Sequence, residues 1–306
     1  MDGRPGTGTP WRAIHGILDA TSAGIGSAVT STFFRAGIES PPFTQQLDAA
    51  SVELPAFDGP GLYEVQAASY VGTLTPGVRI ATPLRADRPT LIYHHGIGEY
   101  PFDTSFDRLF RPKQSTIDAN LIAIRAPYHR SFQSVRTGLA SLANILALQA
   151  VSVALIESVQ HRIDRHVGSP VVVSGTSLGG FVTNLHHIHH GTADRYVPLL
   201  AGLAQDDVFL ESTLRSRVAN HARAAGDTIR DRLNFEDAFA ASDPARVHPL
   251  LARYDRIVRY PVQSTSYGGR PITTVEAGHL SGAAAVDQLR DHVSRFVRRA
   301  GKRTGL

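Results

Sequence analysis

The sequence predicts an α/β protein in which a mostly parallel β-sheet is covered by helices on both faces. Short apolar segments typical of strands alternate with longer helical segments along most of the chain. One strand segment, Val171, Val172 and Val173, is a β-branched run, which is typical of a strand buried on both faces. It leads into a glycine-containing turn and an apolar, helix-compatible segment over residues 178–190. This order of strand, tight turn and helix is the centre of the predicted fold.

The composition is that of an ordinary globular protein, and it excludes several functional classes. The 306 residues can bury a large core, and 42% of them are hydrophobic and 19% charged. The 31 basic residues exceed the 27 acidic ones by too little to indicate a nucleic-acid partner. The chain has no cysteine, which excludes disulfides, thiolate metal ligands and a cysteine nucleophile.

Residues 1–60 are predicted to hold an N-terminal helix and a connecting loop. Helical spacing of apolar residues begins after Pro10 and continues weakly towards Phe33 and Phe34, and Pro41-Pro42 marks the loop. No basic segment leads directly into an apolar stretch, so we expect no secretion signal and a cytoplasmic protein. The uncharged residues 20–34 are too few to span a bilayer, so membrane insertion is not expected.

The α/β core is predicted over residues 61–205 and 249–300, followed by a basic tail at 301–306. Its first two strands are expected to form an antiparallel pair, with Thr75-Pro76-Gly77 as the turn. The alternation that follows implies parallel strands joined by helices. Strands are expected at 62–71, 78–81, 90–94, 120–126, 171–173, 196–203, 250–254 and 272–276, and helices at 139–162, 178–190 and 283–299.

Residues 206–248 interrupt this alternation. The segment is helical in character and rich in arginine, and it carries scattered apolar residues such as Phe209, Leu214 and Phe235. We interpret it as a small helical cap inserted after the strand at 196–203 and lying over the functional site. The alternative is an ordinary pair of surface helices.

The turn after the central strand has the spacing Gly-x-Ser-x-Gly, formed by Gly175, Ser177 and Gly179. Between a strand and a helix, this spacing places the serine on a strained turn, with its hydroxyl above the sheet. The small neighbours avoid clashes, and Gly180 lets the helix approach the sheet. The N–H of Leu178 would then face a developing oxyanion. Glycine-rich turns also bind phosphates, but no Gly-Lys-Ser/Thr or dinucleotide pattern is present.

A serine nucleophile needs a base and an orienting acid, which in this chain order are expected after later strands. His279 follows the last predicted strand and is the candidate base. Asp255 follows the preceding strand and is the candidate acid, which would fix the imidazole tautomer. Asp206 and Asp207, which follow the strand at 196–203, are the alternative acids.

Together these residues resemble the α/β-hydrolase superfamily, over roughly residues 60–300. The resemblance is carried by Gly175-Thr176-Ser177-Leu178-Gly179-Gly180, His95-Gly96-Ile97-Gly98, Asp255 and Gly278-His279. It implies a Ser177–His279–Asp255 triad and an oxyanion hole formed by the N–H groups of Leu178 and Ile97, with Gly98 next best. His94 and His95 are expected to shape this loop. Candidate pocket residues are His95, Gly98, Thr176 and His129.

The expected activity is hydrolysis of carboxylic esters of small to medium acyl substrates through an acyl-enzyme, with no cofactor. A thioesterase, amidase or acyltransferase using the same triad is the first alternative, and a non-catalytic binding protein is the second. The cluster His186, His187, His189 and His190 also raises the question of a metal. No nearby carboxylate joins these histidines, which fall at the far end of the predicted helix, so we expect no metal site.

Overall fold

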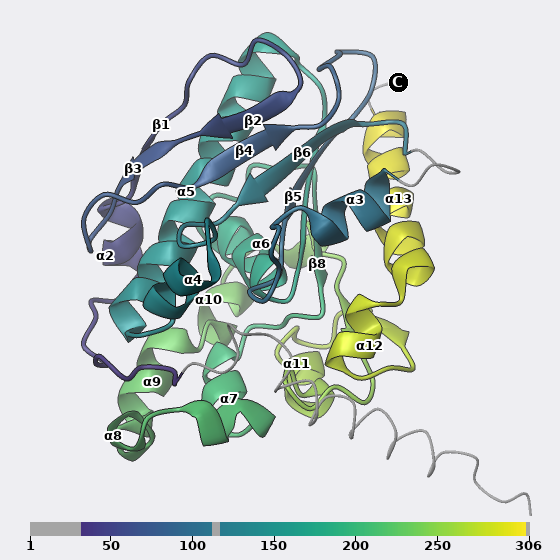
Figure 1. Ribbon diagram of the computed structural model, residues 1–306. Coiled ribbons are helices and arrows are strands. Elements are labelled where there is room, and N and C mark those ends of the chain that lie inside the picture. Colours follow the sequence, from purple (N-terminus) through teal and green to yellow (C-terminus); the bar gives the residue numbers. More distant parts are fainter. Residues whose placement is uncertain (1–31, 112–116, 304–306) are drawn as a thin grey trace, which may run out of the picture.

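The computed structural model describes residues 32–111 and 117–303, and its centre is an eight-stranded sheet (Figure 1). Six neighbouring strands, from β10 to β6, are parallel, whereas β4 is antiparallel to β6 and β2 is antiparallel to β4. In spatial order the strands are β10 (Thr273–Val275), β9 (Leu250–Ala252), β8 (Arg195–Leu199), β7 (Val171–Thr176), β5 (Thr90–His94), β6 (Asn120–Arg125), β4 (Gly77–Ile80) and β2 (Gly61–Glu64). The predicted mostly parallel sheet is confirmed.

Helices cover both faces of this sheet, as predicted. Helices α5 (Leu142–His166) and α6 (Leu178–His189) pack on one face, and α3 (Thr104–Phe110) and α13 (Val286–Arg303) pack on the other (Figure 1). Side chains in β5 alternate between the two cores: Ile92 belongs to the first, whereas Leu91 and Tyr93 belong to the second. This period of two explains why the central strands are apolar throughout.

Helix α5 begins at Leu142 and is capped by Ser141, whose hydroxyl accepts a hydrogen bond from the Asn144 N–H at 3.2 Å. The predicted start at residue 139 was therefore slightly early, and a separate short helix, α4 (Phe132–Gly138), precedes it. Helix α5 is long and apolar enough to cross a membrane by composition, but 78% of its most apolar window is buried inside the protein. Its hydrophobicity is accounted for by the core that it covers.

The first hairpin differs from the prediction. Residues 62–71 do not form one strand, because β3 (Gln66–Ala68) separates from β2 and pairs with β1 (Ser51–Glu53). The turn lies at residues 69–72, where the Gly72 N–H bonds to the Ser69 carbonyl at 3.1 Å, and not at Thr75-Pro76-Gly77. Gly72 has φ +102°, a conformation that glycine adopts without strain.

The insertion between β8 and β9 is helical, as predicted. It contains α7 (Gln205–Leu210), η1 (Thr213–Arg217), α8 (Asn220–Ala224), α9 (Gly226–Leu233), α10 (Glu236–Ala240) and η2 (Pro244–Arg246). The N-terminal part of the described chain joins it: the Phe33 and Phe34 rings lie 5.2 and 4.9 Å from that of Phe209. Phe33 and Phe34 lie in a turn, at which Phe33 forms an isolated β-bridge with Val218. Most of the helix predicted before them lies outside the described residues.

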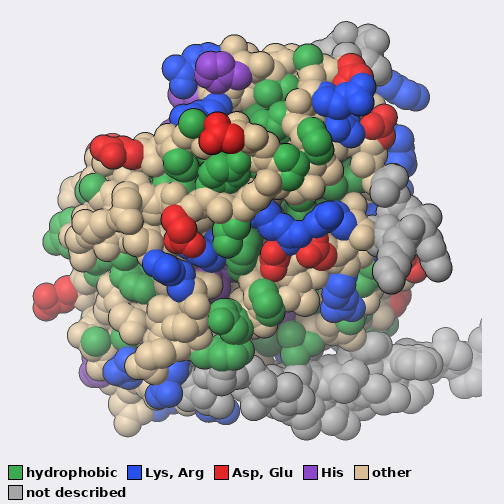
Figure 2. Space-filling view, turned by 45° about the horizontal axis from the view of Figure 1, so that its top comes forward, with side chains coloured by type: hydrophobic (Ala, Val, Ile, Leu, Met, Phe, Trp, Pro, Cys, Tyr) green, Lys and Arg blue, Asp and Glu red, His purple; other side chains and the backbone are tan. Residues whose placement is uncertain are grey.

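The remaining short helices are α2 (Phe43–Asp48), α11 (Tyr260–Thr265) and α12 (His279–Ala283). Helix α13 starts at Val286, three residues later than predicted, because α12 occupies the preceding segment, and it extends to Arg303, into the predicted basic tail. On the face shown in Figure 2, basic and acidic side chains are interspersed, without a continuous surface of one sign.

Candidate active site

Ser177 lies at the sharp turn between β7 and α6, with φ 56° and ψ −112°. A positive φ is strained for serine, so the surrounding backbone must hold it in place. The glycines are required by space: a Cβ on Gly179 would lie 2.0 Å from the His94 carbonyl oxygen, and one on Gly175 would lie 2.4 Å from the Gly179 backbone. A Cβ on Gly180 would lie 2.6 Å from that of Ala201. The close approach expected from the sequence is therefore present.

The structure brings Ser177, His279 and Asp255 into one hydrogen-bonded chain. The Ser177 Oγ lies 3.0 Å from His279 Nε2, and His279 Nδ1 lies 2.6 Å from Asp255 Oδ2. The other carboxylate oxygen, Oδ1, accepts N–H bonds from Ile257 at 2.8 Å and Val258 at 2.7 Å. Asp255 and His279 are buried, whereas Ser177 is partly exposed. This arrangement can move a proton from the serine hydroxyl to the imidazole.

The topology explains why these residues meet. Ser177 follows β7, Asp255 follows β9 and His279 follows β10, and the carboxyl ends of these parallel strands lie at one edge of the sheet. Burial raises the pKa of the Asp255 carboxyl, while His279 and the two backbone N–H groups act in the opposite direction. The hydrogen bonds hold the carboxylate in one orientation towards the imidazole.

The alternative acids are engaged elsewhere. Asp207 is buried and forms a two-pronged ion pair with Arg259, whose Nε lies 3.0 Å from Oδ2. Asp206 accepts a hydrogen bond from the Asn234 side chain at 3.3 Å, and burial raises its pKa. The geometry therefore favours Asp255 over both.

The loop after β5 passes directly beside the serine. A Cβ on Gly96 would lie 3.5 Å from the Thr176 carbonyl oxygen and 3.7 Å from the Ser177 Cβ. The part of the chain that the structure describes offers no acceptor for the N–H groups of Ile97 or Leu178. That these two N–H groups face an oxyanion at Ser177 therefore stays a prediction. Gly98 is exposed at the end of this loop.

Three buried histidines, His94, His95 and His129, support this loop. His95 Nε2 accepts the Ala126 N–H at 3.0 Å, so Nδ1 carries the proton and donates to the Gly96 carbonyl at 2.8 Å. His129 Nε2 lies 3.1 Å from the Ile97 carbonyl oxygen. Burial lowers the pKa of His94 to about 3, and it lowers the pKa of His95 and His129 as well. These residues are therefore neutral, structural groups.

The side chain of Thr176, another candidate pocket residue, is also buried, and its hydroxyl is hydrogen-bonded to the Tyr93 hydroxyl at 2.8 Å. His95 and His129 are likewise buried beneath the loop. Of the four candidate pocket residues, Gly98 alone is exposed.

The histidine cluster on α6 does have a carboxylate neighbour, contrary to the sequence analysis. Glu157 on α5 lies 3.0 Å from His186 Nε2 and 2.9 Å from His161 Nε2, and it accepts a bond from Thr192 at 2.7 Å. Burial raises the pKa of Glu157, but bonds from His186 and Thr192 and the charge of His190 outweigh it and lower the pKa to about 2. Within residues 32–111 and 117–303, no group of three or more histidine, aspartate or glutamate side chains could hold a metal ion.

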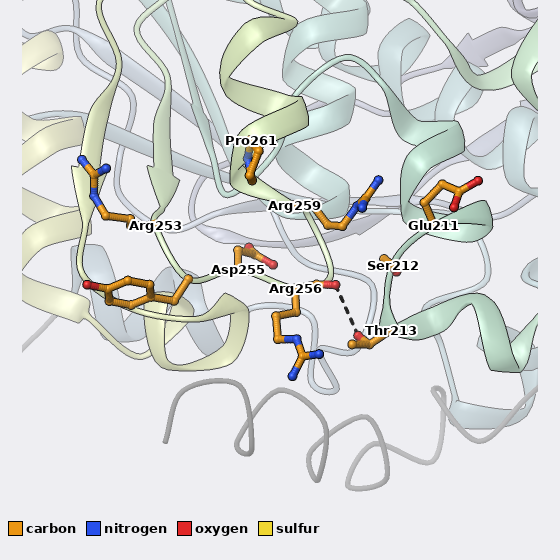
Figure 3. A pocket seen from close by; sticks show the side chains of 9 residues that line it. Glu211, Ser212, Thr213, Arg253, Asp255, Arg256, Arg259 and Pro261 are labelled. Atoms are coloured by element: carbon orange, nitrogen blue, oxygen red, sulfur yellow. Dashed lines mark hydrogen bonds between the residues drawn. The ribbon is translucent and has the colours of Figure 1, made fainter. Parts of the chain in front are cut away.

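A cavity of about 540 Å³ lies beside the acid and was not anticipated from the sequence (Figure 3). Asp255 lines it, but Ser177 and His279 do not. Two of its arginines already have acidic partners: Arg253 binds Glu276 at 2.8 Å, and Arg259 binds Asp207. The cavity therefore adjoins the acid side of the hydrogen-bonded chain and not the serine.

The fold is shared with solved hydrolase structures. The Pyrococcus horikoshii acylaminoacyl peptidase is similar over 79% of this chain and 42% of that one, with 11% identity and a TM-score of 0.52. Brefeldin A esterase, described as a bacterial homologue of human hormone-sensitive lipase, is similar over 98% of this chain and 89% of that one, with 11% identity and a TM-score of 0.53. The chain has the α/β-hydrolase fold. No protein-family model matches this chain, and no curated protein matches it in sequence.

Proposed function

We propose that the protein is a serine hydrolase that cleaves carboxylic esters through an acyl-enzyme. The observation that carries the proposal is the hydrogen-bonded chain from Ser177 through His279 to Asp255, at a strained strand-to-helix turn. The fold alone would not suffice, because one fold supports many functions.

In the proposed mechanism, His279 Nε2 takes the proton from Ser177 Oγ as that oxygen attacks the ester carbonyl carbon. Asp255 holds the imidazole with its proton on Nδ1 and stabilises the imidazolium that forms. The carbonyl oxygen becomes an oxyanion facing the N–H groups of Leu178 and Ile97. Each donor is expected to contribute roughly 3 kcal/mol, by analogy with measured oxyanion holes.

The tetrahedral intermediate then collapses. The bond between the carbonyl carbon and the alcohol oxygen breaks, and His279 gives its proton to the leaving alcohol. The acyl group remains on Ser177 until His279 deprotonates a water molecule, which attacks the same carbonyl carbon. Release of the carboxylic acid returns the proton to Ser177.

Two exposed apolar side chains that follow the loop segments described above suggest the character of the substrate. Tyr100 and Phe132 are 47% and 42% exposed, and their rings lie 4.8 Å apart. Tyr100 follows the loop that carries Ile97, and Phe132 follows the segment of His129, which supports that loop. Exposed apolar surface of this kind often binds ligands. We propose that this pair contacts the apolar part of a neutral ester.

Amide substrates are the second candidate, because one solved structure of similar fold is named an acylaminoacyl peptidase. The test is a panel of p-nitrophenyl esters, from acetate to octanoate, beside the matching p-nitroanilides. The proposal expects ester turnover that falls by at least about 10³-fold in Ser177→Ala. Faster anilide than ester turnover would favour the amidase, and equal ester turnover in Ser177→Ala would exclude the mechanism.

A further inference from the structure

Glu99 ties the loop beside Ser177 to the body of the protein. Its Oε1 accepts the Gly96 N–H at 2.7 Å, and its Oε2 accepts the N–H of Ser105, in the first turn of α3, at 3.0 Å. Its own N–H lies 3.2 Å from the Gly96 carbonyl oxygen. Burial raises the pKa of this carboxyl, and its bonds to Ser105 and Gly96 act in the opposite direction. A partly buried carboxylate with two backbone N–H partners is held in a fixed contact and is not a freely solvated side chain.

The consequence for the loop follows from peptide geometry. The Gly96 carbonyl and the Ile97 N–H belong to one planar unit and point in opposite directions. The carbonyl is held by His95 Nδ1 at 2.8 Å and by the Glu99 N–H, so the direction of the Ile97 N–H is held as well. The Gly96 N–H is occupied by the Glu99 carboxylate, so the next N–H along this loop, that of Ile97, is the candidate donor that the loop contributes beside Leu178.

We propose that Glu99 is a positioning residue, whose carboxylate holds the loop so that the Ile97 N–H points to the oxyanion formed at Ser177. This inference rests on the proposed function, because it assigns a role within that site. A carboxylate suits the position because each of its oxygens can accept one of the two N–H groups. Glutamine accepts one of them and turns its own amide N–H₂ towards the other, so it restores only part of the contact. Alanine restores none.

The test compares Glu99→Gln and Glu99→Ala with the unchanged protein on one p-nitrophenyl ester. Fluorophosphonate titration counts the competent sites, so that kcat refers to folded enzyme only. We expect kcat to fall about tenfold in Glu99→Gln and about 10²-fold in Glu99→Ala, because one oxyanion donor is misdirected. KM should stay within about threefold, since the ground-state ester does not depend on that donor. The affinity for a trifluoromethyl ketone, which forms an oxyanionic adduct, should fall in parallel with kcat.

The matched control is Glu53→Gln, which removes the same charge from an exposed position on β1, in the small second sheet. It should leave kcat and ketone affinity unchanged. Full kcat per site in Glu99→Gln and Glu99→Ala would overturn the inference. So would a loss confined to KM or to the number of folded sites, which indicates a merely structural role. The proposed function fails separately, if the unchanged protein neither hydrolyses esters nor forms the fluorophosphonate adduct.

Discussion

Replacing Asp255 by asparagine tests the proton arrangement that the structure implies. Oδ1 of Asp255 accepts two backbone N–H groups, so the asparagine oxygen must stay there. Turning the amide round would leave two buried N–H groups without acceptors, at a cost of roughly 3 kcal/mol in total. The amide N–H₂ therefore faces His279 Nδ1 and forces the imidazole proton onto Nε2. In that tautomer, His279 cannot accept the proton of Ser177, 3.0 Å away.

We expect kcat of Asp255→Asn to fall by about 10⁴-fold, the loss typical of such a change, which corresponds to about 5 kcal/mol of transition-state stabilisation. The assay is steady-state hydrolysis of p-nitrophenyl butyrate, with unfolding measured in parallel. The matched control is Asp207→Asn: it breaks the Arg259 ion pair and lowers stability, but kcat per folded site should stay within about threefold, because no proton transfer uses Asp207. The reasoning is refuted if Asp255→Asn keeps kcat within tenfold, or if Asp207→Asn loses as much.

Three further changes test the strand-to-helix turn at Ser177, the buried His94 and the exposed Tyr100–Phe132 pair. Gly179→Ala should cost more than about 3 kcal/mol in urea denaturation, because its Cβ would lie 2.0 Å from a backbone oxygen; a wild-type midpoint would contradict the packing. Burial lowers the pKa of His94 to about 3, so only the unfolded chain takes up that proton between pH 6.5 and pH 3, and stability falls as the pH drops through this range. At pH 5 the free energy of unfolding is expected to be about 2 kcal/mol lower than at pH 7.5 because of His94. The unfolding free energy of His94→Gln should therefore depend less on pH, by a similar amount. An unchanged pH dependence would argue against a buried neutral imidazole. Phe132→Ala, which removes the partner of Tyr100, should raise KM for p-nitrophenyl octanoate about tenfold and leave the acetate almost unchanged; equal effects on both esters would place the pair outside the substrate site.

The parts of the fold that the sequence predicted well are those determined by local pattern. The strand β5 was predicted with its observed limits, because an apolar run stands alone between polar or proline-containing segments. The hairpin was predicted less well, because Thr75-Pro76-Gly77 is a strong local turn signal. In the structure Pro76 instead lies on the returning arm, where its carbonyl accepts the Val65 N–H at 3.1 Å. Tertiary pairing outweighed the local signal.

In the candidate site, too, some residues could be predicted from the sequence and others could not. Ser177 was identified from a local motif, and His279 and Asp255 from their positions after successive strands of a known topology. Glu99 was not identified, because its proposed role depends on backbone N–H groups of Gly96 and Ser105, which no side-chain pattern shows.

The carboxylate beside the histidine cluster was missed for a related reason. Glu157 lies on α5 and reaches His186 on α6, and only the packing of the two helices brings them together. The cavity beside Asp255 likewise draws on the insertion and on the segment after β9. Contacts between elements that are distant in sequence can be identified only from the folded structure.

The central claim is that Ser177 is a nucleophile activated by His279 and Asp255. The most direct measurement is intact-mass analysis after reaction with a fluorophosphonate probe, which phosphonylates an activated serine. We expect one adduct per chain, mapped to Ser177, that is lost in Ser177→Ala and forms far more slowly in Asp255→Asn. The absence of an adduct on folded protein, or an adduct that persists in Ser177→Ala, would contradict the claim.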